Sequence, residues 1–430
     1  MQPSRLIALL NQQRAIVYIG LATFLFTLGQ GTAIPIVPLY GNEVGLTAAQ
    51  IGGLVAAFAG ARVFTNVPSA MASDRIGRKW VLIAGGLFAA TGNLLTATSD
   101  DLYLLMAYRF IAGIGSGAFI TVAIAATADL SSPENRARLM SFYQWSFIAG
   151  ITLGPTVGGV VAEFLGIEWP FYFVGIFSTM SAIWTLVMVP ETRVRQSGGA
   201  SQDGLADERP TAPPGSALTS DGREAGFAQF RFMLTGSFLL IMLIFIGVFF
   251  TRGGALFNLL PLIARNDLGL SETGVGVMQT VPAVASLLVL PLVGAISDRY
   301  GRKSIIVPGM GLFVLCLAIL GYGSAVWLFG IGMFLYGIAQ GMQGPVPVAY
   351  VSDLSPANKQ AMAQGMARTQ GDIALMGGAY MLGAISDTFG NAEALLGTAL
   401  AMGVIMVIFL LFARETAQRR RAAAPTGIAR

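Results

Sequence analysis

Charged and amide side chains interrupt several long apolar runs of this 430-residue sequence. A charge in such a run is costly in lipid unless it faces a wet cavity or a partner, so each one is a candidate functional residue. One candidate is a carboxylate and three are arginines, a set suited to binding a proton and an organic anion or zwitterion. The candidates for substrate binding or proton coupling are Arg62, Asn66, Arg109, Arg252, Asp372, Gln30 and Gln340.

Asp372 is the acid that we place deep inside an apolar run, and two arginines are candidates to neutralise it. Arg368 precedes it by one helical turn, although a cation before an anion is the less favourable order on a helix. Arg62 lies in another run at a similar estimated depth, roughly 17 Å from one face of a hydrocarbon core of about 30 Å. The sequence leaves both pairings open, and with them the choice between a proton site or gate and a structural ion pair.

The composition shows that membrane helices must position these residues. Hydrophobic residues make up 54% of the chain and charged residues 11%, against roughly 25% charged residues in an ordinary soluble domain. Apolar runs of about 20 residues, each long enough to cross a bilayer as a helix, are separated by short polar breaks. A soluble enzyme is therefore excluded, and so is a membrane β-barrel, whose strands alternate in polarity.

Residue types that build metal sites and enzyme centres are scarce. The chain has no histidine and one cysteine, Cys316, which excludes an intrachain disulfide and a cysteine metal cluster. We also find no phosphate-binding P-loop and no Gly-x-Ser-x-Gly elbow. We therefore expect no enzymatic activity, no cofactor and no metal. Any proton coupling must use carboxylates, because no imidazole is available.

The apolar runs predict twelve helices in two groups of six. The first group covers residues 16–40, 50–72, 80–98, 102–127, 139–164 and 169–189, and the second covers residues 232–262, 273–297, 304–323, 325–351, 361–385 and 392–413. Between the groups, a stretch rich in Ser, Gly, Pro and Asp predicts a flexible linker. The expected units are an N-terminal half (1–193), the linker (194–229), a C-terminal half (230–414) and a basic tail (415–430).

Lysine and arginine gather in the termini and in alternate loops, whereas the opposite loops hold Arg265 and several acids. Short loops rich in these cations stay cytoplasmic, so we expect both termini and the linker in the cytoplasm. The first apolar run is too long for a signal-peptide core, and we expect it to be retained. The basic tail is explained by this topology, so we expect no nucleic-acid partner.

The two halves repeat each other at a spacing of 224 residues. Asp74 recurs as Asp298 at the head of a matching loop, Asp129 recurs as Asp353, and Glu191 recurs as Glu415. Parallel repeats of this kind place a substrate site between the halves near the membrane midplane. The matching loop motifs are Asp74, Arg75, Gly77, Arg78 and Lys79 in the first half, and Asp298, Arg299, Gly301, Arg302 and Lys303 in the second.

This doubled loop motif resembles the loop signature of the major facilitator superfamily. The resemblance implies an all-α polytopic membrane protein with twelve transmembrane helices in two pseudo-symmetric six-helix bundles. It also implies that the motif aspartate caps a helix N-terminus across the interface between halves, which the helix dipole would favour. A purely topological role for the loop cations is the alternative. In the resembled fold the second and eleventh helices meet, which would let Arg62 reach Asp372.

The fifth predicted helix contains small residues and a proline at Gly150, Gly154, Pro155, Gly158 and Gly159. Small residues at this spacing allow close helix approach, and the proline supplies a bend. The segment resembles the antiporter signature of the twelve-span drug:proton antiporter branch of the superfamily. Generic helix packing is the alternative interpretation.

Arg109, followed by Gly113 and Gly117, resembles a fourth-helix motif whose arginine the family associates with proton transfer, although Ala112 replaces the usual glutamine. A side chain that merely extends to the membrane surface is the alternative. The first helix departs from many drug:proton antiporters, because it offers Gln30 and threonines but no acid.

These observations predict a secondary active transporter in a plasma membrane, the inner membrane of a bacterium. We expect proton-coupled export of amphipathic organic compounds or drugs, with a bias to anionic or zwitterionic substrates, by a monomer in the lipid bilayer. Uptake of an organic anion by symport, lipid flipping and a non-transporting membrane receptor are the alternatives. Its partners would be a small-molecule substrate and protons.

Overall fold

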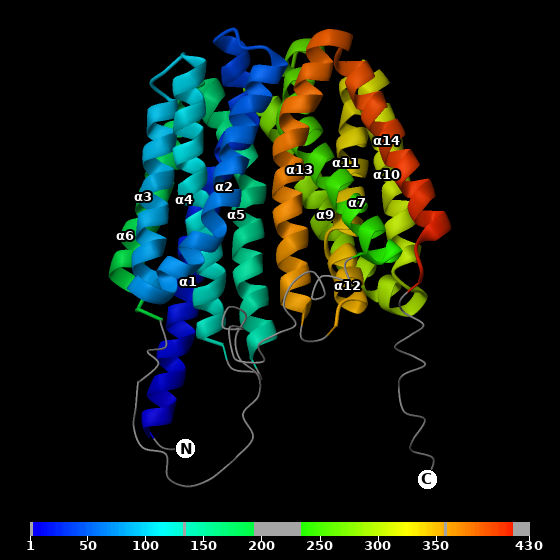
Figure 1. Cartoon of the computed structure of the whole chain (residues 1–430). Coiled ribbons are helices and arrows are strands. Elements are labelled where there is room, and N and C mark those ends of the chain that lie inside the picture. The colour runs from blue at the N-terminus through cyan, green and yellow to red at the C-terminus, as the bar shows by residue number, and fades with distance from the viewer. Residues whose placement is uncertain (1–2, 132–134, 193–233, 357–358, 416–430) are drawn as a thin grey trace, which may run out of the picture.

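The computed structural model describes residues 3–131, 135–192, 234–356 and 359–415. The predicted linker and all of the predicted tail except Glu415 lie outside these ranges. The described ranges contain helices and no strand. Figure 1 shows two bundles of helices side by side, and helix α1 begins at the same end of the molecule at which α14 ends.

The first bundle contains the six predicted helices. They are α1 (Pro3–Glu43), α2 (Ala48–Ile76), α3 (Arg78–Thr96), α4 (Leu102–Asp129), α5 (Arg136–Leu165) and α6 (Trp169–Met188). Helix α1 begins 13 residues earlier than the apolar run predicts, because residues 3–15 continue the same helix.

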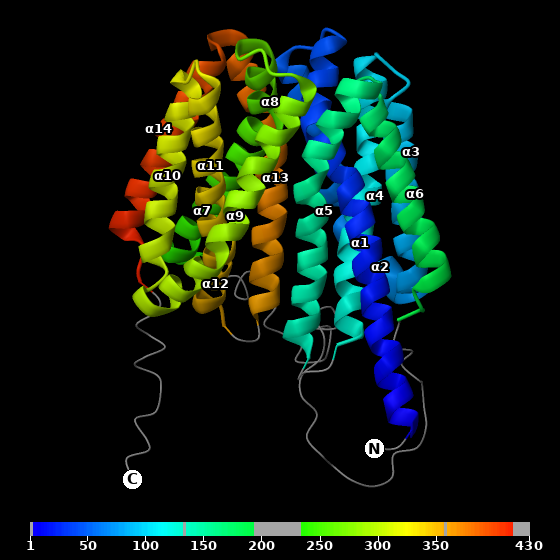
Figure 2. The ribbon, with the colours of Figure 1, turned by 180° about the vertical axis from the view of Figure 1, so that it is seen from behind.

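The second bundle has six helical columns, two of which are interrupted. Its helices are α7 (Gly236–Thr251), α8 (Leu260–Leu262), α9 (Glu272–Tyr300), α10 (Lys303–Tyr322), α11 (Val326–Gln343), α12 (Pro345–Leu354), α13 (Gln360–Phe389) and α14 (Asn391–Phe412). Figure 2 shows the same bundle from behind, with α8 close to the end opposite α12.

The prediction of one regular seventh helix is wrong. The column is α-helical to Thr251, then π-helical over Arg252–Leu259 and again over Ile263–Asp267. Gly253 and Gly254 permit this change, because a Cβ on either would collide with α13, at Leu375 and at Gly378 and Leu382 respectively. The π-helical segments therefore let this column approach α13 closely, and π-helical turns often occur at functional sites.

The tenth predicted helix is broken rather than continuous. Helix α11 ends at Gln343, Gly344 lies between, and α12 begins at Pro345. Pro345 and Pro347 lack the N–H groups that would continue the helical hydrogen bonds, which explains the break.

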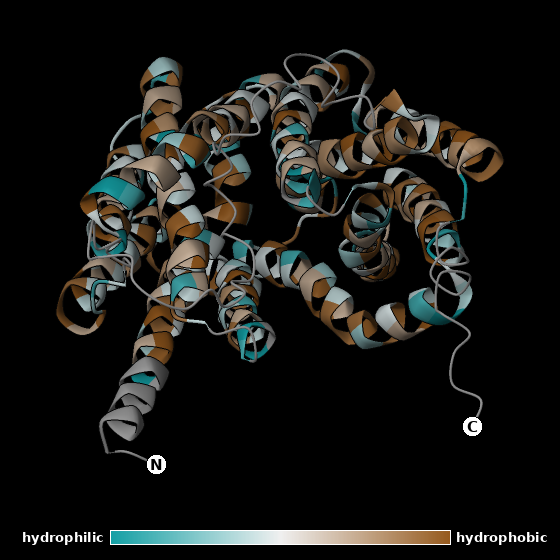
Figure 3. Cartoon of the chain, turned by 60° about the horizontal axis from the view of Figure 1, so that its bottom comes forward, coloured by the Kyte–Doolittle hydropathy of each residue, from teal (hydrophilic) through white to brown (hydrophobic). Residues whose placement is uncertain are grey.

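The outer surface of the bundles is apolar. Large hydrophobic side chains such as Phe64, Trp145, Phe164, Leu288 and Leu411 are exposed, and Figure 3 shows brown hydrophobic residues recurring along the helices of both bundles. Within the described ranges, nine helical columns are long and apolar enough to cross a membrane. The other three contain α3, α11 with α12, and α13, the column that holds Asp372. A surface of this kind faces lipid.

The two bundles meet along two pairs of helices. Helix α2 packs against α13, and α5 packs against α9. These contacts place the charged candidates of α2, α4, α13 and the π-helical segment around the space between the bundles.

Candidate functional site

A central cavity of about 230 Å³ lies between the two bundles. Polar and charged residues from both bundles line it, and four phenylalanine rings lie among them. Those lining residues are Thr27, Gln30, Arg62, Arg109 and Ser116 from the first bundle, Arg252 and Asp372 from the second, and Phe58, Phe147, Phe249 and Phe257. A cavity with apolar walls and a few convergent polar groups is the usual form of a small-molecule site.

Asp372 contacts residues of the opposite bundle. Its Oδ1 lies 3.8 Å from Arg62 Nη2, and Asn66 donates from Nδ2 to its Oδ2 at 3.4 Å. Thr121 holds Asn66 by donating to the amide Oδ1 at 3.2 Å. Among the described residues no ion pair joins Asp372 to Arg368, whose side chain is exposed. The structure therefore places Arg62, rather than Arg368, beside the buried carboxylate.

Arg109 is buried rather than extended toward the membrane surface. Its side chain lies 4.7 Å from the ring centre of Phe58 and donates from Nη1 to Asn93 Oδ1 at 3.0 Å. Asn93 is oriented for this contact, because its Nδ2 donates to the Ala89 carbonyl at 2.8 Å. The Nε of Arg109 has no hydrogen-bond partner. Asn93 was not a predicted site residue, although a buried amide in an apolar run is a signal that could have found it.

Arg252 begins the first π-helical segment and lines the same cavity. Its guanidinium lies 5.3 Å from the ring centre of Phe257, and its Nε also lacks a partner. No carboxylate lies within ion-pair distance of Arg109 or Arg252 in the described part of the chain. Two desolvated cations without a counter-ion are suited to attract a negative group.

The two glutamine candidates lie in different places. Gln30 lines the central cavity, and its Nε2 is buried without an acceptor. Gln340 instead lines a smaller cavity of about 110 Å³ inside the second bundle. That cavity shares Phe249 and Arg252 with the central one, so the two cavities adjoin.

A vestibule of about 480 Å³ continues from the central cavity. The two share Ile120, Phe147 and Phe249. The vestibule also reaches Gln364 and Arg368 in the first turns of α13. The central cavity is therefore connected toward the end of the molecule at which α13 begins.

That end carries both loop motifs, and we call it the glycine-turn end. Gly77 and Gly301 have φ values of +110° and +101°, which only glycine adopts readily. Arg78 Nε bonds Asp129 at 2.8 Å, and its repeat counterpart Arg302 bonds Asp353 at 3.1 Å. Each arginine also donates to a serine of the preceding helix. The repeat in the sequence is thus a repeat of side-chain contacts.

The two motif lysines share a backbone contact. The Lys79 N–H donates to Glu191 at 3.3 Å and the Lys303 N–H donates to Glu415 at 3.0 Å. The Lys303 side chain also donates to the Leu410 and Ala413 carbonyls at 2.9 Å. Arg299 lies over the Tyr300 ring at 5.3 Å. Arg75 is in the last turn of α2.

The expected cap between halves by the motif aspartates is not present in this structure. Asp74 and Asp298 are exposed, and each pairs at 2.6 Å with the arginine four residues later in its own bundle. The physical reason is that each aspartate is paired within its own bundle, whereas the backbone N–H groups that carboxylates cap across the bundles are those of Ala48, Ala49 and Thr273, at the starts of α2 and α9.

Two acids join the bundles at that opposite end, which we call the acid-clamp end. Asp387 of α13 accepts hydrogen bonds from the backbone N–H groups of Ala48 and Ala49, at 2.9 and 2.8 Å, where α2 begins. Glu163 of α5 accepts one from the Thr273 N–H at 3.0 Å, where α9 begins. Neither acid was a predicted site residue, although Glu163 and Asp387 are separated by the repeat spacing of 224 residues, which is a signal for them in the sequence.

The small residues of the fifth helix lie at two interfaces. A Cβ on Gly150, Gly154 or Gly158 would collide with α1, and one on Gly159 would collide with the start of α9. Pro155 lies on the α9 side, with its carbonyl against Gly276. The motif therefore brings α5 close both to α1 and to the other bundle.

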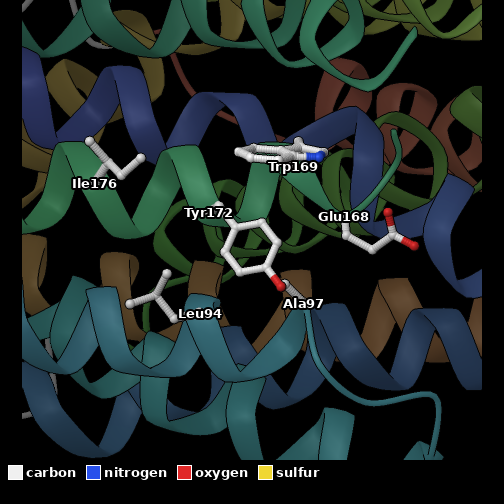
Figure 4. Close-up of a pocket in the computed structure, with 6 residues that line it drawn as sticks. All are labelled: Leu94, Ala97, Glu168, Trp169, Tyr172 and Ile176. Atoms are coloured by element: carbon white, nitrogen blue, oxygen red, sulfur yellow. The ribbon is translucent and has the colours of Figure 1, made fainter. Parts of the chain in front are cut away.

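A groove of about 680 Å³ on the flank of the first bundle is larger than the central cavity but chemically simpler. Figure 4 shows its lining, with Trp169 and Tyr172 from α6 above Leu94 from α3 and with Glu168 beside them. It contains one carboxylate and no cation among its lining residues. The central cavity is the better candidate site, because it collects charges from both bundles.

Comparison with known proteins supports the architecture. The quinolone resistance protein NorA of Staphylococcus aureus is 28% identical over 190 residues, which cover 44% of this chain and 48% of that protein. The class H tetracycline resistance protein of Pasteurella multocida is 26% identical over 356 residues, covering 82% of this chain and 84% of that protein. A bacterial homologue of the human lysosomal transporter Spinster has the same fold, with a TM-score of 0.75, 14% identity and coverage of 97% and 98% of the two chains.

The matched stretch thus spans about half the length of NorA and most of the length of the tetracycline resistance protein. The family described as the Major Facilitator Superfamily matches residues 19–266 and 246–429. Together with the twelve helical columns and the repeated loop motif, this match shows that the chain belongs to the Major Facilitator Superfamily of membrane transporters.

Proposed function

We propose that the protein exports amphipathic organic compounds by proton antiport and prefers anionic or zwitterionic substrates. The observation that carries the preference is the pair Arg109 and Arg252, two cavity-lining cations that lie over phenylalanine rings without a carboxylate nearby. A bare cation would be repelled by these groups, and an aromatic anion would meet both charge and ring surfaces. The similarity to a quinolone and a tetracycline resistance protein supports export of organic compounds.

The direction of access follows from the loop charges and the contacts between the bundles. The glycine-turn end carries the arginines and lysines of both motifs, so we assign it to the cytoplasm. The vestibule leads toward that end and the acids close the other one, which corresponds to an inward-facing state. Rocking of the two bundles around the central cavity would then expose it to the outside.

Thiol labelling tests this assignment of the two ends. An impermeant thiol reagent applied to intact cells should label Glu43→Cys and spare Asp74→Cys.

Asp372 is the proposed proton site. It is the acid that lines the central cavity, it is buried, and its partners Arg62 and Asn66 belong to the other bundle. When the bundles move, the carboxylate loses the cation that favours its ionised form and takes up a proton. Return of the bundles restores Arg62 and releases that proton. One proton would then enter for each outward movement of substrate, with no covalent step.

Flux in proteoliposomes under an imposed pH gradient tests this proposal, with matched anionic, zwitterionic and cationic compounds. Asp372→Asn should abolish the pH-driven flux while sparing substrate exchange, and Arg62→Gln should change its pH dependence. Glu43→Gln, which removes an exposed acid at the end of α1, is the control for Asp372→Asn. Normal proton-driven transport by Asp372→Asn would overturn the coupling role.

The same arginines favour one other function, uptake of an organic anion together with a proton. The direction of net flux distinguishes the two, because symport accumulates the anion on the side to which protons flow, whereas antiport depletes it there.

A further inference from the structure

The small cavity inside the second bundle is a built side chamber of the central site. We define it by Phe249, Arg252, Phe313, Tyr336, Gln340 and Gln343. Its volume is about 110 Å³, somewhat less than the roughly 150 Å³ of an engineered cavity that binds benzene. Because Phe249 and Arg252 also line the central cavity, a planar ring in the chamber would project from a substrate bound there.

Closely packed aromatic rings line the side chamber. Phe313 and Tyr336 are fully buried and pack edge to face, with ring centres 5.1 Å apart. Phe249 is stacked with Phe245 at 6.3 Å on the α7 side. Aromatic faces and edges of this kind favour a flat aromatic guest.

Two buried polar atoms of the chamber residues have no partner. Gln343 is 4% exposed, and its Nε2 donates to the Ile306 carbonyl at 2.6 Å, which fixes the amide. Its Oε1 therefore remains a buried acceptor without a donor. Arg252 Nε is a buried donor without an acceptor. A complementary ligand must bring a hydrogen-bond donor for Gln343 and a negative or acceptor group for Arg252.

We propose that the side chamber is a specificity subsite for the hydroxylated ring of an aromatic acid. The carboxylate would lie against Arg252, the ring between Phe249 and Tyr336, and a ring hydroxyl would donate to Gln343 Oε1. This inference rests on the proposed anion preference of the central cavity. It adds that a ring with a hydrogen-bond donor is selected over the same ring without one.

The test is equilibrium binding of benzoate and of the three hydroxybenzoate isomers to the full-length protein in nanodiscs. We expect at least one isomer to bind about fivefold to tenfold more tightly than benzoate, the factor given by one additional hydrogen bond. In Gln343→Leu the ratio between the affinity of the preferred isomer and that of benzoate should fall to about one. Arg252→Gln should weaken binding of all four compounds.

Gln343→Met keeps the side-chain length and replaces Gln343→Leu if the latter does not fold. Equal binding of benzoate and all three isomers by the native protein, or equal weakening of all four by the Gln343 variants, would overturn the subsite. Failure of the proposed function is a separate result, because it would appear as the absence of pH-driven flux in proteoliposomes whatever the ratio of affinities.

Discussion

The two ends of the molecule use the same interaction for different purposes. At the acid-clamp end, Glu163 and Asp387 accept hydrogen bonds from the first N–H groups of helices in the other bundle. At the glycine-turn end, Glu191 and Glu415 accept them from the N–H groups of Arg78 and Lys303, the first residues of α3 and α10 in their own bundle. A carboxylate at a helix N-terminus is stabilising in either place. What differs is whether the two partners separate when the bundles rock.

This comparison implies that variants at the glycine-turn end change stability, whereas variants at the acid-clamp end change which side is open. Cross-linking between Asn42→Cys and Asn266→Cys can report the second property, because these two side chains hydrogen-bond across the bundles at 3.2 Å. The background should carry Cys316→Ala, although Cys316 itself is buried.

The largest expected effect is loss of stability in Arg302→Met. The Arg302 side chain is 9% exposed and bonds Asp298 and Asp353, as well as Ser297. Removing a buried cation from such a network should lower the free energy of unfolding by about 3 kcal/mol. Chemical unfolding in detergent measures the loss, with Arg299→Met as the control. The yield of the Asn42→Cys and Asn266→Cys cross-link at the acid-clamp end should stay unchanged. A lower yield would contradict the idea that the glycine-turn end affects only stability.

The double variant Glu163→Gln with Asp387→Asn should open the acid-clamp end. Each carboxylate at a helix N-terminus contributes about 1 kcal/mol, so losing both shifts the equilibrium by about 2 kcal/mol, or roughly thirtyfold. The yield of the Asn42→Cys and Asn266→Cys cross-link should fall accordingly. Glu43→Gln at the same end is the control, and a native yield in the double variant would show that the acids do not hold the bundles together.

The single variants should divide this effect unequally. Asp387 accepts two backbone hydrogen bonds and Glu163 accepts one. Asp387→Asn should therefore lower the cross-linking yield more than Glu163→Gln, by a difference of about 0.5 kcal/mol. Measuring the cross-linking yield at increasing concentrations of a ligand that stabilises one conformation resolves a difference of this size. The reverse order would indicate that the number of bonds does not decide the strength of the clamp.

The smallest expected effect belongs to Asp74→Asn. The Asp74 side chain is 62% exposed and pairs with Arg78, four residues later, across the turn between α2 and α3. Exposed pairs of this type contribute about 0.3–0.5 kcal/mol, so unfolding in this state should hardly change. A loss above about 1 kcal/mol would mean that Asp74 stabilises the fold itself rather than a different arrangement of the bundles.

Much of the architecture was predictable because it depends on periodic features of the chain. Apolar length determined the helices to within a few residues in most cases, and the repeat spacing matched Arg78 with Arg302 and Glu191 with Glu415. Their contacts are repeated as well, because the same residues at the same spacing meet the same neighbours.

The parts that were not predictable depend on which helices lie next to each other. The seventh column changes to a π-helix where Gly253 meets the backbone of α13, a contact that no local propensity encodes. Tyr336 and Gln343 are ordinary members of an apolar helix in the sequence, and only the packing of α10 and α11 shows their place in the side chamber. The partner of Asp372 was likewise undecided until α2 and α13 were placed together.

The acid clamp has a consequence for how such a protein can be assembled. Subtracting the repeat spacing from Asp387 gives position 163, and subtracting it from Thr273 gives position 49. The two contacts are therefore equivalent. In the numbering of the first half, position 163 of each half contacts position 49 of the other half. That reciprocity is the definition of an isologous interface. A six-helix chain carrying both positions would be self-complementary, so two separate copies could pair around a twofold axis through the same carboxylates without any linker.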